Sequence, residues 1–320
     1  MKAVHVERIG TPLEVLYGER PVPVPTARQV LIEVHAAGVN PRDRQLGEGR
    51  YAFRGLSGRL PTILGSDVSG VVVDRGRRVT RFAPGDEVLA MQTTLGGMGG
   101  FAEYVAVHES AVARKPAALG HVEAAALPVV GLTAWQALAR GDTIAPGRVT
   151  VLGATGGVGH LAVQLAHRAG ATVTAVCGPD KAELAVRLGA DAVIDHRSQR
   201  LADALGAPQD VLLDTVGTGS LRSVRSLLAP GGRYLTTVPG TRAVAEWAAT
   251  AVTGRIGDRR SARLVLVLPD GPRLAALAGA VAAGDLRILV HDTWPLADAG
   301  RALALLGDRQ VRGKIVLTVR

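Results

Sequence analysis

A run of glycines at residues 153–159, GATGGVG, is the clearest chemical feature of the chain. The residues before it are apolar and β-branched and those after it have helical spacing, so the glycines join an expected strand to an expected helix. Glycines in that setting let the backbone approach a pyrophosphate, and the N-terminus of the following helix favours the anion. Thr155 stands where the fingerprint G-x-G-x-x-G has its second glycine. The run therefore predicts a dinucleotide site, with an ordinary strand-to-helix turn as the alternative.

The end of the next expected strand, residues 171–177, indicates which dinucleotide would bind. A site that prefers NAD usually carries Asp or Glu about 20 residues after the glycines, where it holds the ribose diol. No acid stands at that strand end, and Asp180 comes late enough to be expected as a helix cap. Lys181 has two interpretations, a point charge for a 2′-phosphate or a solvated helix residue. The pattern favours NADPH over NADH.

Two other residues in this region carry reactive side chains. Cys177 is the only cysteine of the chain, so an internal disulfide and a four-cysteine zinc site are both excluded. At a strand end it is expected to be a small buried thiol rather than a nucleophile. His160 stands on the first turn of the expected helix and is predicted to be solvated.

Composition narrows the class of protein. The chain has 320 residues, 47% of them hydrophobic and 20% charged, which is typical of a globular α/β protein with room for two domains. The net charge is +9, but basic and acidic residues alternate and aromatic residues make up only 3%, which disfavours nucleic-acid binding. No apolar run approaches about 18 residues, which predicts no membrane span. The first ten residues, MKAVHVERIG, lack the apolar core of a signal peptide, and we expect a cytoplasmic protein.

The sequence pattern around these residues divides the chain into two parts with different expected secondary structure. Strands are expected at 30–39, 68–76, 84–91 and 100–110, where β-branched runs end at Gly or follow Pro-Gly turns. Their irregular spacing predicts a barrel-like, mainly antiparallel unit. Residues 121–140 then have helical spacing.

From Arg148 onward, expected strands and short helices alternate, which predicts a parallel, doubly wound sheet. Its sixth strand is expected in ARLVLVLP, at 262–269. The tail then predicts a helix at 272–283, a strand at 286–290, a helix at 295–307 and a last strand at 313–319.

Several segments, in this order along the chain, resemble the medium-chain dehydrogenase/reductase superfamily, and within it the zinc-free quinone oxidoreductase branch. They include AAGVNPRDRQLGEGRY (36–51), VTRFAPGDEVLA (79–90), ALPVVGLTAWQAL (126–138), VLGATGGVGHLAVQLA (151–166) and VRGKIVLTV (311–319). The glycine loop of this family has the form A-x-x-G-G-V-G, which accounts for Thr155. The resemblance implies a GroES-like, mainly antiparallel β-barrel catalytic domain, residues 1–123 and 269–320. It also implies a Rossmann NADP(H)-binding domain, residues 124–268.

The residues at the positions of the family's catalytic zinc argue against a metal. Zinc-dependent relatives have Cys in a G-V-C-x-T-D stretch and His in a G-H-E-x-x-G stretch, where this chain has GVNPRD and GSDVSG. Asn40 and Ser66 replace these two ligands, and the region of the third, around Val129, is apolar. Catalytic zinc needs three N, S or O ligands. No metal is therefore expected, and Asp67 is expected to be a structural turn residue.

The resemblance also implies the roles of individual residues. Asn40, Asp43 and Tyr51 are the predicted catalytic residues, with Asn40 able to donate its amide to a carbonyl oxygen. An Asn-Pro turn, a helix-cap carboxylate and a packing residue are the respective alternatives. The predicted cofactor-binding residues are Thr133, Ala154, Thr155, Gly156, Gly157, Val158, Cys177, Gly178, Lys181, His196, Thr215, Val216, Val238, Leu268 and Lys314.

These residues predict an NADPH-dependent, zinc-independent oxidoreductase that transfers a hydride to a quinone or an α,β-unsaturated carbonyl. Without a Lewis acid, substrates whose charge develops on an enolate or hydroquinone oxygen are favoured, because hydrogen-bond donors can stabilise that charge. Two alternatives remain open: a pathway-specific reductase or cyclase of secondary metabolism, and a non-catalytic NADPH sensor. The expected partners are a small-molecule substrate and a second copy of the chain, paired through the Rossmann edge strand.

Overall fold

The computed structural model describes residues 1–50, 60–92, 99–238, 240–253, 259–306 and 310–320. The chain divides into unit 1, Met1–Leu132 with Leu268–Arg320, and unit 2, Thr133–Val267. The sequence placed the first boundary at residues 123/124, whereas the structure places it inside helix α3 (Pro128–Leu138). The reason is that α2 (His121–Ala126) packs on unit 1: a Cβ added to Gly38 would lie 2.4 Å from the Ala125 carbonyl oxygen.

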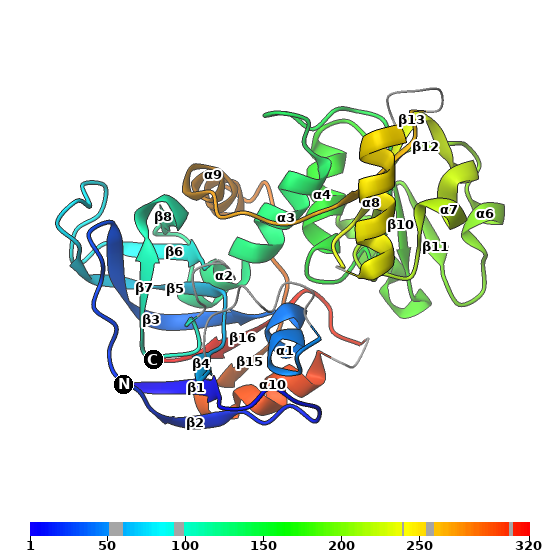
Figure 1. The fold of residues 1–320 in the computed structure, drawn as a ribbon. Helices are drawn as coiled ribbons and strands as arrows, with labels where there is room; N and C mark the ends of the chain where they lie inside the picture. Colours follow the sequence, from blue (N-terminus) through cyan, green and yellow to red (C-terminus); the bar gives the residue numbers. More distant parts are fainter. Residues whose placement is uncertain (51–59, 93–98, 239, 254–258, 307–309) are drawn as a thin grey trace. The chain divides into compact units, whose positions relative to one another are not determined.

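Unit 1 is built on a mainly antiparallel sheet in the order β15-β16-β3-β5-β6-β8, with β7 also paired to β3. A smaller sheet has the order β2-β1-β4. Strands β15 and β16, red in Figure 1, lie near the C-terminus of the chain. They complete the sheet because β16 pairs with β3, which lies near the N-terminus of the chain. The strands are β1 (Lys2–Val6), β2 (Leu16–Glu19), β3 (Gln29–Val39), β4 (Thr62–Ile63), β5 (Asp67–Arg75), β6 (Glu87–Met91), β7 (Tyr104–His108), β8 (Val112–Arg114), β15 (Val290–Pro295) and β16 (Lys314–Thr318).

The core of unit 1 follows from the period-two alternation of these strands. Alternate β-branched residues of β3 and β5, such as Ile32, Val34 and Val68, are fully buried. The unit's helices are α1 (Pro41–Gly47), α2, α9 (Gly271–Ala282) and α10 (Ala299–Leu305).

Unit 2 is a parallel sheet in the order β11-β10-β9-β12-β13-β14. The predicted α/β architecture, a mainly antiparallel domain and a Rossmann sheet, is confirmed. The strands are β9 (Arg148–Leu152), β10 (Thr172–Cys177), β11 (Ala192–Asp195), β12 (Gln209–Asp214), β13 (Leu228–Thr236) and β14 (Ser261–Leu264). The helices, beside part of α3, are α4 (Gly159–Arg168), α5 (Ala182–Arg187), α6 (Leu201–Ala204), α7 (Leu221–Val224) and α8 (Thr241–Thr253).

Some elements differ from those expected. The strand predicted at 286–290 is β15, which begins only at Val290, although Leu286 and Ile288 ahead of it are buried. Within the alternating series after Arg148, the segment SLRSVRSLLAPGG (220–232) predicts one helix, but α7 ends at Val224 and the Pro-Gly-Gly segment at 230–232 belongs to β13. Asp180 caps no helix, since Gly178 precedes a 3₁₀ turn (Pro179–Lys181) and α5 follows it directly. In the described part of the chain, no helix combines the length and apolarity needed to cross a bilayer.

Candidate functional site

The glycine run forms the turn between β9 and α4 in unit 2. Gly153 has a φ of +74°, which L side chains rarely adopt, and its N–H bonds the Val176 carbonyl of β10 at 3.0 Å. A Cβ on Gly159 would lie 2.1 Å from the Gly153 carbonyl oxygen and 2.8 Å from the Ala154 Cα, so only glycine lets α4 begin this close to the strand. A Cβ on Gly156 would lie 3.3 Å from the same oxygen. The turn is thus a cradle of bare backbone at a helix N-terminus, which fits a pyrophosphate.

His160 stabilises this turn, and the prediction that it is solvated is wrong. Its side chain is fully buried, and its Nδ1 lies 2.9 Å from the Gly156 carbonyl oxygen. A carbonyl only accepts, so Nδ1 carries the hydrogen. Residues 159–166 of α4 are all buried, so His160 is enclosed as its neighbours Leu161 and Val163 are.

The strand ends beside the turn carry basic side chains together with the carboxylates of Asp180 and Asp195. Cys177 is buried, and burial raises the pKa of its thiol, which agrees with an inert residue rather than a nucleophile. Lys181 is only 9% exposed, and His196, after β11, is exposed. Arg197 was not expected from the sequence, yet its Nη2 lies 3.7 Å from the Asp180 carboxylate, and a Cβ on Gly178 would come within 3.3 Å of that nitrogen.

The remaining predicted cofactor residues lie at several places. Thr215 follows β12, and its hydroxyl donates to the Leu152 carbonyl at 2.7 Å, which ties the ends of β12 and β9 together. Val216 is 43% exposed next to it, while Thr133 is 4% exposed on α3. Val238 is half-buried after β13. Leu268 and Lys314 belong to unit 1.

Unit 1 holds a buried polar cluster at the starts of α1, β5 and β16. The Lys314 ammonium donates to the Val39 carbonyl at 2.8 Å, to Asn40 Oδ1 at 2.6 Å and to Asp67 Oδ2 at 3.1 Å. Asp67 also accepts the Val129 N–H at 2.7 Å. Lys314 is 3% exposed and Asp67 is fully buried, and burial lowers the pKa of the lysine although Asp67 opposes that shift. The ammonium therefore saturates its three hydrogen-bond directions inside the protein.

Asp43 forms the second half of this cluster. Its carboxylate accepts the Asn40 N–H at 2.8 Å and the Ser66 hydroxyl at 3.3 Å, and Ser66 in turn accepts from Arg42 Nε at 2.9 Å. The side chain is fully buried, and burial raises the pKa of Asp43 to about 6, against the opposing charge of Arg42. A proton on this carboxyl is therefore exchanged near neutral pH.

Asn40 is the N-cap residue of α1, with Pro41 in the first helical position. Its side-chain amide donates to Asp67 Oδ2 at 2.9 Å and to the Gly38 carbonyl at 3.3 Å, and its oxygen accepts from Lys314. Both amide hydrogens already have acceptors, so a donation to substrate would have to displace one of these bonds. Arg42 is half-buried and also donates to the Gln92 carbonyl at 3.0 Å. The predicted Tyr51 lies outside the described residues.

The cluster does not fit a zinc ion. Among the described residues, no three His, Cys, Asp or Glu side chains are grouped so that they could hold a metal. The oxygens that face the centre of the cluster, those of Asn40 and Asp67, bind the Lys314 ammonium instead. The positive charge at the centre of the cluster is therefore the ammonium group of Lys314.

Two family models match parts of the chain. The Alcohol dehydrogenase GroES-like domain model matches residues 26–117, and the Zinc-binding dehydrogenase model matches residues 188–317. The chain is 34% identical over 307 residues to the Chloroplast envelope quinone oxidoreductase homolog of Arabidopsis thaliana, covering 93% of this chain and 92% of the relative.

Two solved structures are similar over the whole chain. The quinone oxidoreductase from Coxiella burnetii has a TM-score of 0.91 and 31% identity, over 100% of this chain and 99% of the other. The Escherichia coli quinone oxidoreductase complexed with NADPH has a TM-score of 0.85 and 25% identity, over 100% of both chains. The chain therefore belongs to the medium-chain dehydrogenase/reductase superfamily, in its quinone oxidoreductase branch, and is an oxidoreductase.

Proposed function

We propose that the protein reduces a quinone or an α,β-unsaturated carbonyl with NADPH and without zinc. One observation carries this proposal: the Lys314 ammonium fills the cluster in which Asn40 and Ser66 replace the zinc ligands of zinc-dependent relatives. Relatives named quinone oxidoreductase support the substrate class, and the Escherichia coli relative is complexed with NADPH. Substrates that need no Lewis acid are the ones that such a site favours.

The cofactor would be held in unit 2 by the glycine turn and the residues around it. Gly156, Gly157 and the start of α4 offer bare backbone for the pyrophosphate. Lys181 and Arg197 are suited to a 2′-phosphate, and no acid stands at the end of β10 to hold a ribose diol. When bound, the reduced nicotinamide supplies a hydride, and a proton completes the reduction of the substrate.

The polar cluster of unit 1 would serve the substrate. The half-buried Arg42 guanidinium is a donor for an enolate or hydroquinone oxygen, and its position is fixed by Ser66 and the Gln92 carbonyl. The Asp43 carboxyl, with its pKa of about 6, can exchange a proton. Two hydrogen bonds connect it to Arg42, because Arg42 donates to Ser66 and Ser66 donates to Asp43. Asn40 and Lys314 act as positioning residues, since their polar atoms are used inside the cluster.

The test is a panel of quinones, enones, enals and simple ketones, with oxidation of NADPH and of NADH followed by absorbance and zinc measured on the same preparation. We expect turnover of quinones or enones with NADPH in protein free of zinc. Ketone turnover that requires bound zinc contradicts the proposal. Tight NADPH binding without turnover of any substrate favours the sensor alternative. As a control for cofactor binding, Gly157→Val should abolish binding of both cofactors while the far-UV circular dichroism stays unchanged.

We also infer that the protein is a cytoplasmic homodimer. Strand β14 is the end strand of its sheet, and Leu266 beyond it is 40% exposed, which suits pairing with a second copy. A single cysteine suits a reducing compartment. Light scattering should give twice the chain mass of 33.1 kDa, and a monomer contradicts the inference. Cell fractionation with an antibody tests the compartment.

A further inference from the structure

A pocket lies within unit 2, at the end of the parallel sheet opposite to the glycine turn. It has a volume of about 540 Å³, within the range of small-molecule sites. One side of it is a row of residues paired across four adjacent strands, Val149, Val211, Arg233 and Ser261. The glycine turn leaves the carboxyl end of β9, so the two sites do not share residues.

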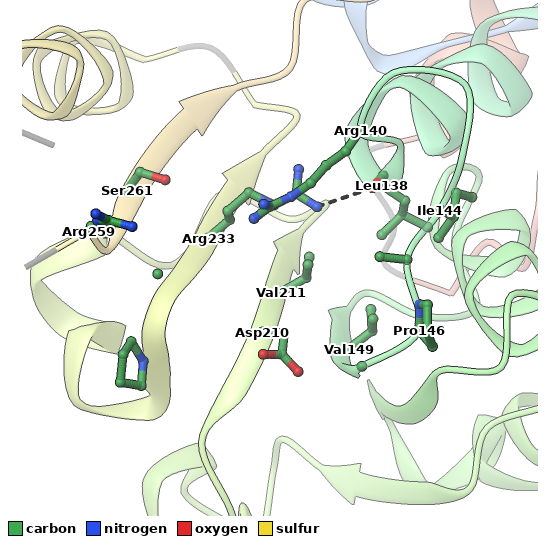
Figure 2. A pocket seen from close by; sticks show the side chains of 14 residues that line it. Leu138, Arg140, Ile144, Pro146, Val149, Asp210, Val211, Arg233, Arg259 and Ser261 are labelled. Atoms are coloured by element: carbon green, nitrogen blue, oxygen red, sulfur yellow. Dashed lines mark hydrogen bonds between the residues drawn. The ribbon is translucent and has the colours of Figure 1, made fainter. Parts of the chain in front are cut away.

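Arginines dominate the charge of this pocket. Arg140, Arg233 and Arg259 line it, against the single carboxylate of Asp210. Figure 2 shows the side chains of Arg140 and Arg233 close to each other, beside the Leu138 carbonyl that Arg233 bonds at 3.1 Å. The Asp210 carboxylate is already used, because it accepts the Arg148 N–H at 2.8 Å. In the described part of unit 2, no carboxylate forms an ion pair with Arg140, Arg233 or Arg259.

Arg233 is the most buried of the three, since Arg140 and Arg259 are exposed. Its Nε is buried and has no hydrogen-bond partner among the described residues. Burial, together with the charges of Arg140 and Arg263, lowers the pKa of this guanidinium to about 10, so it stays charged at neutral pH. A desolvated cation beside like charges is unfavourable by itself, and a bound anion would relieve it.

We propose that this pocket binds a small molecule that carries a phosphate group with two negative charges. Guanidinium forks match the oxygens of a phosphate in bidentate geometry, and several arginines around one carboxylate call for more than one negative charge. The volume exceeds that of a lone inorganic anion, so we expect an organic phosphate, whose apolar part would face Val149 and Val211. The proposal does not depend on the oxidoreductase activity.

Titration calorimetry with inorganic pyrophosphate, at constant ionic strength, tests the proposal on the full chain. We expect saturable binding that weakens about tenfold or more in Arg140→Gln/Arg259→Gln. The matched control Arg200→Gln/Arg222→Gln removes the same charge from exposed positions of unit 2 and should bind as the wild type does. Absence of saturable binding, or an equal loss in the control, overturns the proposal.

Two further arms locate the site and its chemistry. Pyrophosphate could also occupy the glycine turn, so the titration is repeated with Gly157→Val, in which binding should persist. Binding lost in Gly157→Val but kept in the arginine double variant overturns the proposal, and so does binding of citrate in preference to pyrophosphate. Arg233→Met should abolish binding without lowering the Tm, because it removes an unsatisfied charge. Binding that survives in this variant also overturns the proposal.

Discussion

The glycine turn of unit 2 and the polar cluster of unit 1 reach fixed geometry by opposite means. The turn keeps its shape because side chains are missing, so that a carbonyl lies where a Cβ on Gly159 would stand. The cluster keeps its shape because Lys314, Asn40, Asp67 and Asp43 fill one another's hydrogen-bonding positions. A site made of backbone tolerates no added atom, whereas a site made of paired charges tolerates no missing partner.

The largest effect on stability and cofactor binding is expected for a substitution of Gly159, because the turn has no room for an added side chain there. Gly159→Val places atoms within 2.1 Å of a carbonyl oxygen, and we expect a loss of about 4 kcal/mol or more in stability of unit 2, with no measurable NADPH binding. Fluorescence titration and thermal unfolding measure the two. Gly206→Ala is the matched control, since a Cβ there meets nothing within 4 Å. Normal cofactor affinity in Gly159→Val would show that the turn is not tight.

The paired cluster predicts the next largest effect. Lys314→Met leaves the Asp67 carboxylate buried without its cation, and we expect a loss of about 3–5 kcal/mol in the free energy of unfolding. Asp67→Asn should be costly for the same reason. The double variant should lose less than the sum of the two, because the pair is removed together. Additive losses in denaturant unfolding would mean that the two side chains do not interact.

The buried Asp43 carboxyl should make the stability of the protein depend on pH. Burial raises its pKa from the ordinary 3.8 to about 6, so the folded protein keeps a proton that the unfolded chain releases. The unfolding free energy of the wild type should therefore fall as pH rises from about 4 to about 6, by about 2–3 kcal/mol from this group. Asp43→Asn removes this slope and leaves the neighbouring charges of Arg42, Asp67 and Lys314 in place. Equal slopes in both proteins would contradict the buried carboxyl.

The smallest effect is expected at the charged strand ends. Lys181→Ala and Arg197→Ala should each weaken NADPH binding about fivefold to tenfold and leave NADH nearly unchanged, because only NADPH has a 2′-phosphate. Arg187→Ala, on α5, controls for the loss of one charge. Equal losses of affinity for NADPH and NADH would mean that these residues support folding rather than selectivity for NADPH.

The comparison also explains what the sequence could predict. The glycines that the turn requires all lie within residues 153–159, so these glycines and their place between strand and helix predict it. The Lys314–Asp67 pair joins residues 247 positions apart, and Arg197 reaches Asp180 from the next strand of the sheet. Such contacts depend on the order of the strands in the sheet, which the local spacing of residues does not predict. The family resemblance predicts a role for Lys314 but does not predict its hydrogen-bond partners. The prediction for His160 is wrong because α4 is buried on every side from Gly159 to Ala166, and that burial depends on elements far away in the sequence.

The pairing of β16 with β3 also orders events at the ribosome. Residues 133–267 of unit 2 are continuous and can fold as soon as they emerge, whereas the sheet of unit 1 lacks β15 and β16 until residues 290–318 have been synthesised. Until then the edge of β3 at 36–39 is unpaired, and the acceptors around Asp67 have no ammonium. While unit 2 is already folded, the nascent chain thus still carries an open strand edge, with backbone groups that can pair with another strand.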